Sequence, residues 1–135
     1  MVNFSKATHY ALRALMYLVK NKGRSYIKIK EIAKNEDMPR NFLSKILQVL
    51  IKNRIVNSSL GPMGGVKLAS DYRRISVADV ITAIDGRMNE EGCVLFGYKR
   101  CPELVSCPIQ NECQNIRRKF HSKLKNITLN KLYNF

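Results

Sequence analysis

The sequence predicts a mainly α-helical protein built on a winged helix-turn-helix, with a small β-hairpin wing and a long C-terminal dimerisation helix. Three observations predict this fold. Two short amphipathic segments flank a tight polar turn, a hairpin rich in glycine and proline follows them, and an apolar stripe at helical spacing runs near the C-terminus. The 135 residues suffice for one domain, or for a small domain with an appended element.

The first predicted helix runs from Phe4 to Lys22, with Ser5 as its N-cap. Its apolar residues cover more than one face, so we expect part of this helix to lie in a subunit interface. His9 and Arg13 stand one turn apart on the remaining polar side. The core-facing stripe comprises Ala7, Tyr10, Ala11, Ala14, Leu15, Leu18 and Val19.

A helix-turn-helix is predicted next. Ile27–Lys34 forms a short second helix, residues 35–38 form the turn, and Pro39 fits the first position of a third helix that runs to about Asn53. The second helix of such a motif enters the major groove of DNA, where its polar side chains pair with base edges. A solvated helix face would show the same pattern. The candidate DNA-binding residues are Arg40, Asn41, Ser44, Lys45 and Gln48, opposite a buried face of Phe42, Leu43, Ile46, Leu47 and Leu50.

A β-hairpin wing follows the helix-turn-helix directly. Residues 54–58 and 66–68 form its strands, and the turn between them is rich in glycine and proline. Gly64 and Gly65 are candidate DNA contacts, because glycine lets a wing tip approach the backbone or minor groove closely. A hairpin without DNA contact is the alternative.

The remaining chain supplies a fourth helix and a long last helix. Ser76 and Asp79 make a capping box that opens the fourth helix, whereas residues 86–106 show neither helical nor strand periodicity. The last helix starts near Pro108 and has little core of its own, so a two-fold partner would cover its apolar stripe. That stripe is Ile116, Phe120, Leu124 and Ile127. The predicted division is a DNA-binding domain (1–85), a cysteine-bearing cluster-binding loop (86–107) and a dimerisation helix (108–135).

The charge is strongly positive and unevenly distributed. Of the net charge of +14, residues 1–80 carry +10 and residues 81–135 carry +4. Such an excess points to nucleic acid as the partner and places the binding surface in the first part of the chain. We expect a cytoplasmic protein with no membrane partner, because there is no membrane-length apolar run and no signal-peptide pattern. The chain shows no nucleophile–base pairing and no phosphate-binding glycine loop, so we expect no enzyme.

All four cysteines lie between Cys93 and Cys113, with the spacing C-x7-C-x5-C-x5-C. In a reducing compartment, clustered thiols more often bind metal or react than form disulfides. Thiolates suit zinc and iron–sulfur clusters, and the lack of C-x2-C pairs favours an iron–sulfur cluster over zinc. Four unrelated cysteines are the alternative.

The sequence resembles the Rrf2 family of bacterial transcription regulators over nearly its whole length. The resemblance implies a homodimer that binds double-stranded DNA at a pseudo-palindromic operator. It also implies that three cysteines hold a [2Fe–2S] or [4Fe–4S] cluster, as in many members, although some members have none. In those members the cluster reports iron, cluster supply, nitric oxide or redox state. The matching motifs are Tyr10–Leu15, Glu31–Ala33, Gly61–Gly65 followed by Leu68–Ala69, and Ile127–Leu129.

Two cysteine trios match the family's ligand spacing. Cys101, Cys107 and Cys113 resemble the ligands of cluster-biogenesis regulators, whereas Cys93, Cys101 and Cys107 resemble those of iron-responsive members. The second trio also lies at the family's distance from the C-terminal motif, so we expect it to hold the cluster. By resemblance to nitric-oxide-sensing members, His9 of the other subunit is the expected fourth ligand, and Cys113 is the alternative.

The sequence departs from the family pattern at three positions. Gln110 stands where biogenesis regulators place a histidine ligand, and Leu60 stands where some relatives place an arginine for the minor groove. Ser44 stands where some relatives carry glutamate, which implies a different operator preference.

These features together predict a dimeric repressor whose operator affinity depends on an iron–sulfur cluster. One alternative is a winged-helix regulator whose cysteines hold structural zinc or act as a thiol switch. Another is a cluster-free regulator controlled by a partner enzyme.

Overall fold

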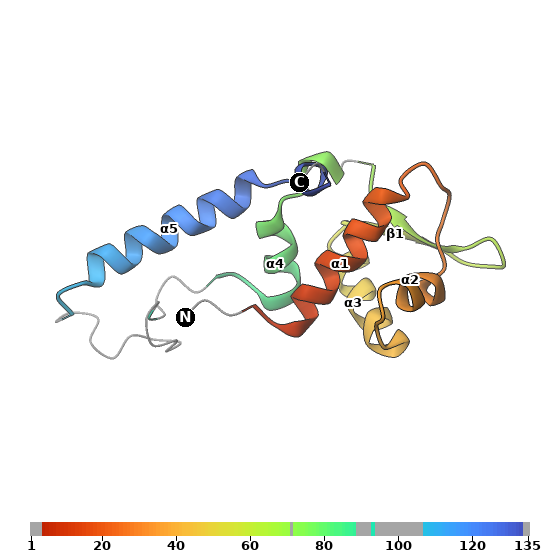
Figure 1. The fold of residues 1–135 in the computed structure, drawn as a ribbon, viewed down its shortest axis with the longest axis horizontal. Coiled ribbons are helices and arrows are strands. Elements are labelled where there is room, and N and C mark those ends of the chain that lie inside the picture. Colours follow the sequence, from red (N-terminus) through yellow and green to blue (C-terminus); the bar gives the residue numbers. More distant parts are fainter. Residues whose placement is uncertain (1–3, 71, 89–92, 94–106, 134–135) are drawn as a thin grey trace.

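The computed structural model describes residues 4–70, 72–88, 93 and 107–133, and it is mainly helical with a two-stranded antiparallel hairpin. The predicted fold class is thereby confirmed. Figure 1 shows the helix-turn-helix and hairpin at one end of the molecule and the long helix α5 projecting at the other. The elements in order are α1 (Lys6–Lys20), α2 (Ile29–Asn35), α3 (Arg40–Lys52), β1 (Val56–Ser59), β2 (Gly65–Leu68), a 3-10 turn (Tyr72–Arg74), α4 (Val77–Asp85), α5 (Gln110–Asn126) and α6 (Leu129–Leu132).

Ser5 is the N-cap of α1, as predicted, although the helix begins at Lys6 rather than at Phe4. The Ser5 hydroxyl accepts a hydrogen bond from the Thr8 N–H at 3.1 Å, as expected of an N-cap. The helix ends at Lys20, two residues before the predicted end. One side of this helix packs within the subunit. Its buried residues are Thr8, Ala11, Ala14, Leu15, Leu18 and Val19.

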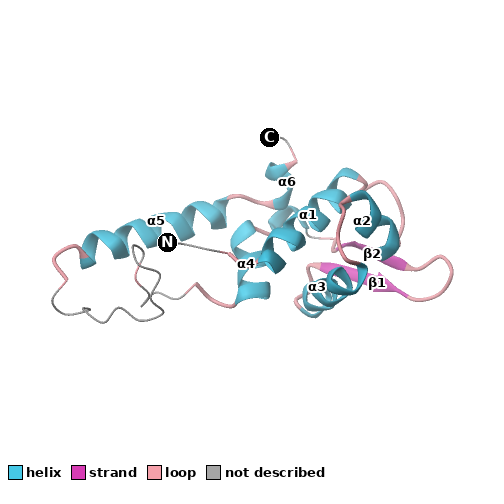
Figure 2. Cartoon of the chain, turned by 60° about the horizontal axis from the view of Figure 1, so that its bottom comes forward, coloured by secondary structure: helices cyan, strands magenta, loops and turns pink. Residues whose placement is uncertain are grey.

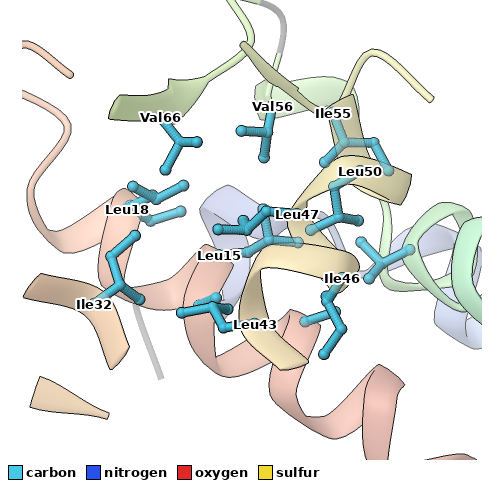
Figure 3. Packing of buried hydrophobic residues seen from close by; sticks show 14 of the residues in the cluster. Leu15, Leu18, Ile32, Leu43, Ile46, Leu47, Leu50, Ile55, Val56 and Val66 are labelled. Atoms are coloured by element: carbon cyan, nitrogen blue, oxygen red, sulfur yellow. The ribbon is translucent and has the colours of Figure 1, made fainter. Parts of the chain in front are cut away.

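The core lies between α1, α2, α3 and the inner face of the hairpin (Figure 3). Helix α3 contributes four buried side chains at helical spacing, and these pack against Leu15 and Leu18 of α1, Ile32 of α2, and the strand residues Val56 and Val66. The α3 residues are Leu43, Ile46, Leu47 and Leu50. Helix α3 is thus held by its apolar face, and its opposite face is directed outward.

The structure corrects several predicted element ends. The first strand is Val56–Ser59 rather than 54–58, and α5 begins at Gln110 rather than near Pro108. Two further corrections concern Ile27 and Pro39. Ile27 is not helical: its N–H and C=O form hydrogen bonds of 2.8 Å with Val66, so this residue extends the hairpin by an isolated bridge. Its burial in the core explains why an apolar residue stands there, and β-branching suits this extended conformation. Pro39 occupies the N-cap of α3 rather than its first helical position, with ψ of 121°. Both errors concern element ends, where local patterns are weakest.

The hairpin pairs Val56 with Leu68 and Ser59 with Gly65. It is joined to the end of α3 through Ile55, whose N–H donates to the Leu50 carbonyl and whose carbonyl accepts from Ala69. These bonds fix the position of the wing relative to α3.

The C-terminal part returns to the domain beside the start of α4. The predicted capping box is present, with the Asp79 N–H donating to the Ser76 hydroxyl and the Ser76 N–H donating to the Asp79 carboxylate. The Val77 N–H donates to the Ile127 carbonyl at 2.8 Å, and the Leu129 side chain is fully buried. The C-terminal end of α5 is therefore anchored in the core.

The rest of α5 extends away from the core, as Figures 1 and 2 both show. None of its described residues is buried. Ile116 is 55% exposed and Phe120 is 36% exposed, although the Phe120 ring stacks on Phe4 at a centroid distance of 6.2 Å. The predicted apolar stripe thus lies largely uncovered in the single subunit. Within the described ranges, no helix combines the length and apolarity needed to cross a membrane.

Candidate DNA-binding surface and cysteine segment

The outer face of α3 carries the polar side chains that the sequence predicts. Arg40, Asn41, Lys45 and Gln48 are exposed, and Ser44 is half-buried. Sequence reasoning missed Val49, which is 36% exposed on the same helix. An exposed aliphatic side chain of this kind offers an apolar contact for a thymine methyl group.

The turn before α3 is held by a side chain from α1. The Arg13 guanidinium donates to the Glu36 carboxylate at 3.2 Å and also to the Glu36 carbonyl. Asp37, next in the turn, has a φ of 51°, which an aspartate tolerates better than most residues. Helix α1 therefore fixes the turn that precedes α3.

A second polar network fixes α2 on α1. The Tyr17 hydroxyl donates to the Glu31 carboxylate at 2.7 Å, and the Arg24 guanidinium donates to the other carboxylate oxygen at 3.1 Å. Hydrogen bonding from Arg24, and then from Tyr17, lowers the pKa of Glu31. The same carboxylate raises the pKa of Tyr17, because it favours the protonated phenol.

The wing is held by close backbone packing. A Cβ on Gly64 would lie 2.2 Å from the Ser59 carbonyl oxygen, and a Cβ on Gly65 would lie 2.3 Å from the Ile27 carbonyl oxygen. Packing within the protein thus requires both glycines, and their contact with DNA stays a prediction. Sequence reasoning also missed that Met63, beside them in the turn, is 87% exposed.

Asp85, the last residue of α4, connects the start of α1 to the point where the cysteine-bearing loop (86–107) begins. Its carboxylate accepts hydrogen bonds from the Ser5 N–H at 3.0 Å and the Thr8 hydroxyl at 2.9 Å. Partial burial raises the pKa of Asp85, but the hydrogen bonds from Ser5 and Thr8 outweigh burial, and the net pKa is lowered. The chain therefore leaves α4 beside the first turn of α1.

The predicted metal ligands are only partly within the described residues. Cys101 lies outside them, together with most of the predicted cluster-binding loop. Cys93, Cys107 and Cys113 are half-buried, and His9 is exposed on α1, next to Thr8. Among the residues that the structure describes, no group of three His, Cys, Asp or Glu side chains converges on a metal position.

A wide groove of about 1180 Å³ lies between α4 and α5. Its lining includes Asp79 of α4, Arg87 just after α4, and Arg117, Arg118 and Lys125 of α5. This basic and open lining differs from the enclosed, mostly apolar pockets that usually bind small molecules.

Known sequences match this chain over nearly its full length. The family model "Rrf2: Iron-dependent Transcriptional regulator" matches residues 4–134. A sequence from Aquifex aeolicus (strain VF5), classed as an HTH-type transcriptional regulator, is 34% identical over 97% of this chain and 91% of its own length. The HTH-type transcriptional regulator IscR of Klebsiella pneumoniae (strain 342) is 27% identical over 93% of this chain and 76% of its own length.

Solved structures share the fold. CymR, the global cysteine regulator of B. subtilis, superposes with a TM-score of 0.83 at 22% identity, covering 99% of this chain and 98% of that chain. T. potens IscR superposes with a TM-score of 0.75 at 24% identity, covering 98% of this chain and 87% of that chain. At these identities the likeness establishes the architecture alone.

Proposed function

Because this chain belongs to the Rrf2 family and is a helix-turn-helix transcriptional regulator, we propose that it is a homodimeric repressor whose operator binding is modulated by an iron–sulfur cluster. Its assignment as a regulator rather than an enzyme follows from the family. One observation carries the DNA-binding half of the proposal. Helix α3 buries its apolar face and presents a polar, basic face outward in the basic part of the chain.

The side chains of that face suit direct contact with DNA. Asn41 and Gln48 offer the amide pairs that suit adenine, and Lys45 offers a donor for guanine or phosphate. Arg40, at the helix N-terminus, lies where recognition helices meet base edges or the backbone. Arg13 and Glu36 hold the preceding turn, so these side chains are presented by a fixed helix.

The exposed stripe of α5 supports a homodimer. Ile116 and Phe120 leave apolar surface in water in the single subunit, and a second copy of the same helix would cover it. Two recognition helices related by a two-fold axis would then read the two halves of a pseudo-palindromic operator.

The donor set of the cysteine segment fits an iron–sulfur cluster. We assign Cys93, Cys101 and Cys107 as ligands, because thiolates are the ligands that these clusters take and the family model is described as iron-dependent. Cys93 and Cys107 are both half-buried, which offers partial shielding from water. When bound, the cluster would connect Cys93, Cys101 and Cys107. Loss or oxidation of the cluster would remove that connection.

The fourth ligand that we propose is His9 of the other subunit, with Cys113 as the alternative. Imidazole binds cluster iron in Rieske centres, so a histidine is chemically competent. His9 is exposed on α1. The neighbouring Thr8 donates a hydrogen bond to Asp85, the last residue of α4. Within one subunit the first turn of α1 thus lies beside the end of α4, and the choice of His9 from the other subunit rests on the resemblance to nitric-oxide-sensing members.

The alternatives to an iron–sulfur cluster differ in whether they need the cysteines. Structural zinc or a thiol switch would also use clustered cysteines. A cluster-free regulator controlled by a partner enzyme would not require the cysteines for its DNA response.

Purification without oxygen, followed by iron, sulfide and zinc analysis and a visible absorption spectrum, tests the proposal. Iron with sulfide, and operator affinity that differs between apo and cluster-loaded protein at fixed salt, is the expected result. The triple variant Cys93→Ser, Cys101→Ser, Cys107→Ser should lose the cluster, whereas Cys113→Ser should retain it. Zinc without sulfide would favour the structural site or thiol switch. Equal operator affinity of the two forms would remove the sensing role.

A further inference from the structure

The tip of the wing exposes two large apolar side chains. Leu60 is 98% exposed and Met63 is 87% exposed, on either side of Gly61 and Pro62. The loop that carries them projects from the end of the molecule that holds α2 and α3, opposite α5, in both Figure 1 and Figure 2. Adjacent exposed apolar side chains on a projecting loop often mark a contact surface.

The loop presents these side chains on a fixed backbone. The Gly64 N–H donates to the Gly61 carbonyl at 3.0 Å, and the Lys28 ammonium donates to the same carbonyl at 3.1 Å. Gly64 and Gly65 pack too closely against the neighbouring backbone to admit a side chain. A tip held in this way loses little conformational freedom when it contacts a partner.

The surroundings of the tip favour DNA as that partner. Lys28 touches the turn itself, and the exposed Lys67, on the returning strand, lies over the Tyr26 ring at 4.7 Å. Backbone hydrogen bonds through Ile55 tie the hairpin to the end of the recognition helix. A tip attached to that helix and flanked by cations therefore lies close to phosphate groups when the helix occupies the major groove.

We propose that Leu60 and Met63 form an apolar wedge that enters the minor groove beside each half-site and presses on a flexible base step. This inference rests on the proposed DNA-binding function and adds a specificity element to it. Minor-groove proteins insert leucine, methionine and proline in this way, because partial unstacking lets bent DNA contact more of the protein.

The wedge implies a preference for DNA that deforms easily. Pyrimidine–purine steps such as TA and CA/TG unstack at lower cost than other steps, so they should recur under the wing. An arginine at the wing would instead favour the narrow minor groove of A-tracts. Leu60 lacks that charge, so A-tract preference should be absent.

Selection from a random duplex library tests this preference. The wild-type dimer should recover an operator with TA or CA/TG steps flanking the recognised half-sites. The double variant Leu60→Ala, Met63→Ala should recover the same half-sites without the flanking preference. Leu60→Met, which keeps an apolar tip, should behave as wild type, and Leu60→Arg should shift the flanks towards A-tracts.

Binding and fluorescence measurements on the selected operator complete the test. The double alanine variant should bind about tenfold more weakly, because it loses apolar contact, while the slope of log affinity against log salt stays unchanged. Fluorescence of 2-aminopurine at the flanking step should rise with wild type and not with the double variant. Circular dichroism of the double variant should match wild type, since both side chains are exposed.

Three results would overturn the wedge. Unchanged affinity and unchanged flanking preference in the double variant would exclude any role of the tip in DNA binding. A lower salt slope in that variant would show that the loss is electrostatic. Recovery of no preferred sequence by the wild-type protein would reject the wedge together with the proposed function, whereas the first two results would leave that function intact.

Discussion

Asp85 connects two segments that are far apart in the chain. Its carboxylate accepts hydrogen bonds from Ser5 and Thr8, and Thr8 is 1% exposed, so its hydroxyl has little access to water. The charge also lies at the N-terminus of α1, where the helix dipole stabilises an anion. One side chain thus holds the first turn of α1 against the end of α4.

Replacing Asp85 should lower the stability of the protein, because this side chain holds α1 against the end of α4. Asp85→Asn, which keeps an acceptor and removes the charge, should lower the free energy of unfolding by roughly 0.5–1 kcal/mol, given the exposure of the site. Asp85→Ala should cost more, about 1–3 kcal/mol, because the Thr8 hydroxyl loses its partner. Urea denaturation at pH 7 measures both changes, and equal stability of Asp85→Ala and wild type would contradict the role.

The pH dependence of stability follows from the lowered pKa of Asp85. A carboxylate whose pKa is lower in the folded state stabilises the protein fully above its ordinary pKa of 3.8. This contribution is lost as the pH falls through the folded-state value. The stability difference between wild type and Asp85→Asn should therefore shrink below about pH 3.8, which denaturation curves across the acid range would measure.

Lys45 provides the residue-scale test of the recognition face. Lys45→Ala should weaken binding to the selected operator and reduce the salt slope by about one if the ammonium contacts phosphate. If Lys45 contacts a base instead, discrimination at one position of the operator should fall by about 1–3 kcal/mol. Fluorescence anisotropy titrations measure both effects. Lys123→Ala on α5 removes the same charge elsewhere and should leave specificity unchanged. If both variants weaken operator binding equally, Lys45 contributes only to the overall positive charge of the protein.

At the scale of elements, short-range signals predicted most of the fold. Ser5 and the Ser76 capping box could be identified because a cap acts on residues three positions away. Partners such as Arg13 and Glu36 lie on different elements and leave no fixed spacing in the sequence, so their hydrogen bonds could not be predicted. Ile27 was assigned to a helix because its bridge to Val66 depends on a strand much later in the chain.

The candidate site was predictable to different degrees along the chain. The outer face of α3 followed from helical periodicity, and its exposure confirms that pattern. The exposure of Val49 and Met63 was missed, because an apolar residue type alone predicts burial. The ligands of the cysteine segment stay predictions, since Cys101 lies outside the described residues.

The apolar stripe of α5 can be tested as a dimer contact. Ile116→Glu should shift the protein from dimer to monomer, because burial of a charge in an apolar interface carries a large desolvation cost. Analytical ultracentrifugation measures the change, and operator affinity should fall with it, since half of the contacts are lost. Lys119→Glu, which introduces the same side chain at an already charged and exposed position, serves as the control. A dimeric Ile116→Glu variant would place the interface on another surface.

At the scale of the whole molecule, the charge distribution predicts strongly salt-dependent binding. Residues 1–80 carry a net charge of +10, and a dimer doubles the cations available for phosphate. If the dimer neutralises about six phosphates or more, operator affinity should fall at least about 10³-fold between 50 and 200 mM salt. Anisotropy titrations at several salt concentrations measure this fall. A nearly flat dependence would contradict a phosphate-contacting surface.

Among the described residues, the backbone hydrogen bonds that join α5 to the core lie at its C-terminal end, which has a mechanical consequence. The 17-residue helix is about 25 Å long, and hydrogen bonds around Ile127 and Leu129 fix that end to the core. A tilt of about 5° at this pivot moves the other end, beside Cys113, by about 2 Å, which is the size of shift that switches subunit interfaces. A displacement of about 2 Å near Cys113 is therefore expected to tilt α5 by about 5° about its C-terminal end. In the proposed dimer, such a rotation would change the relative orientation of the two α3 helices.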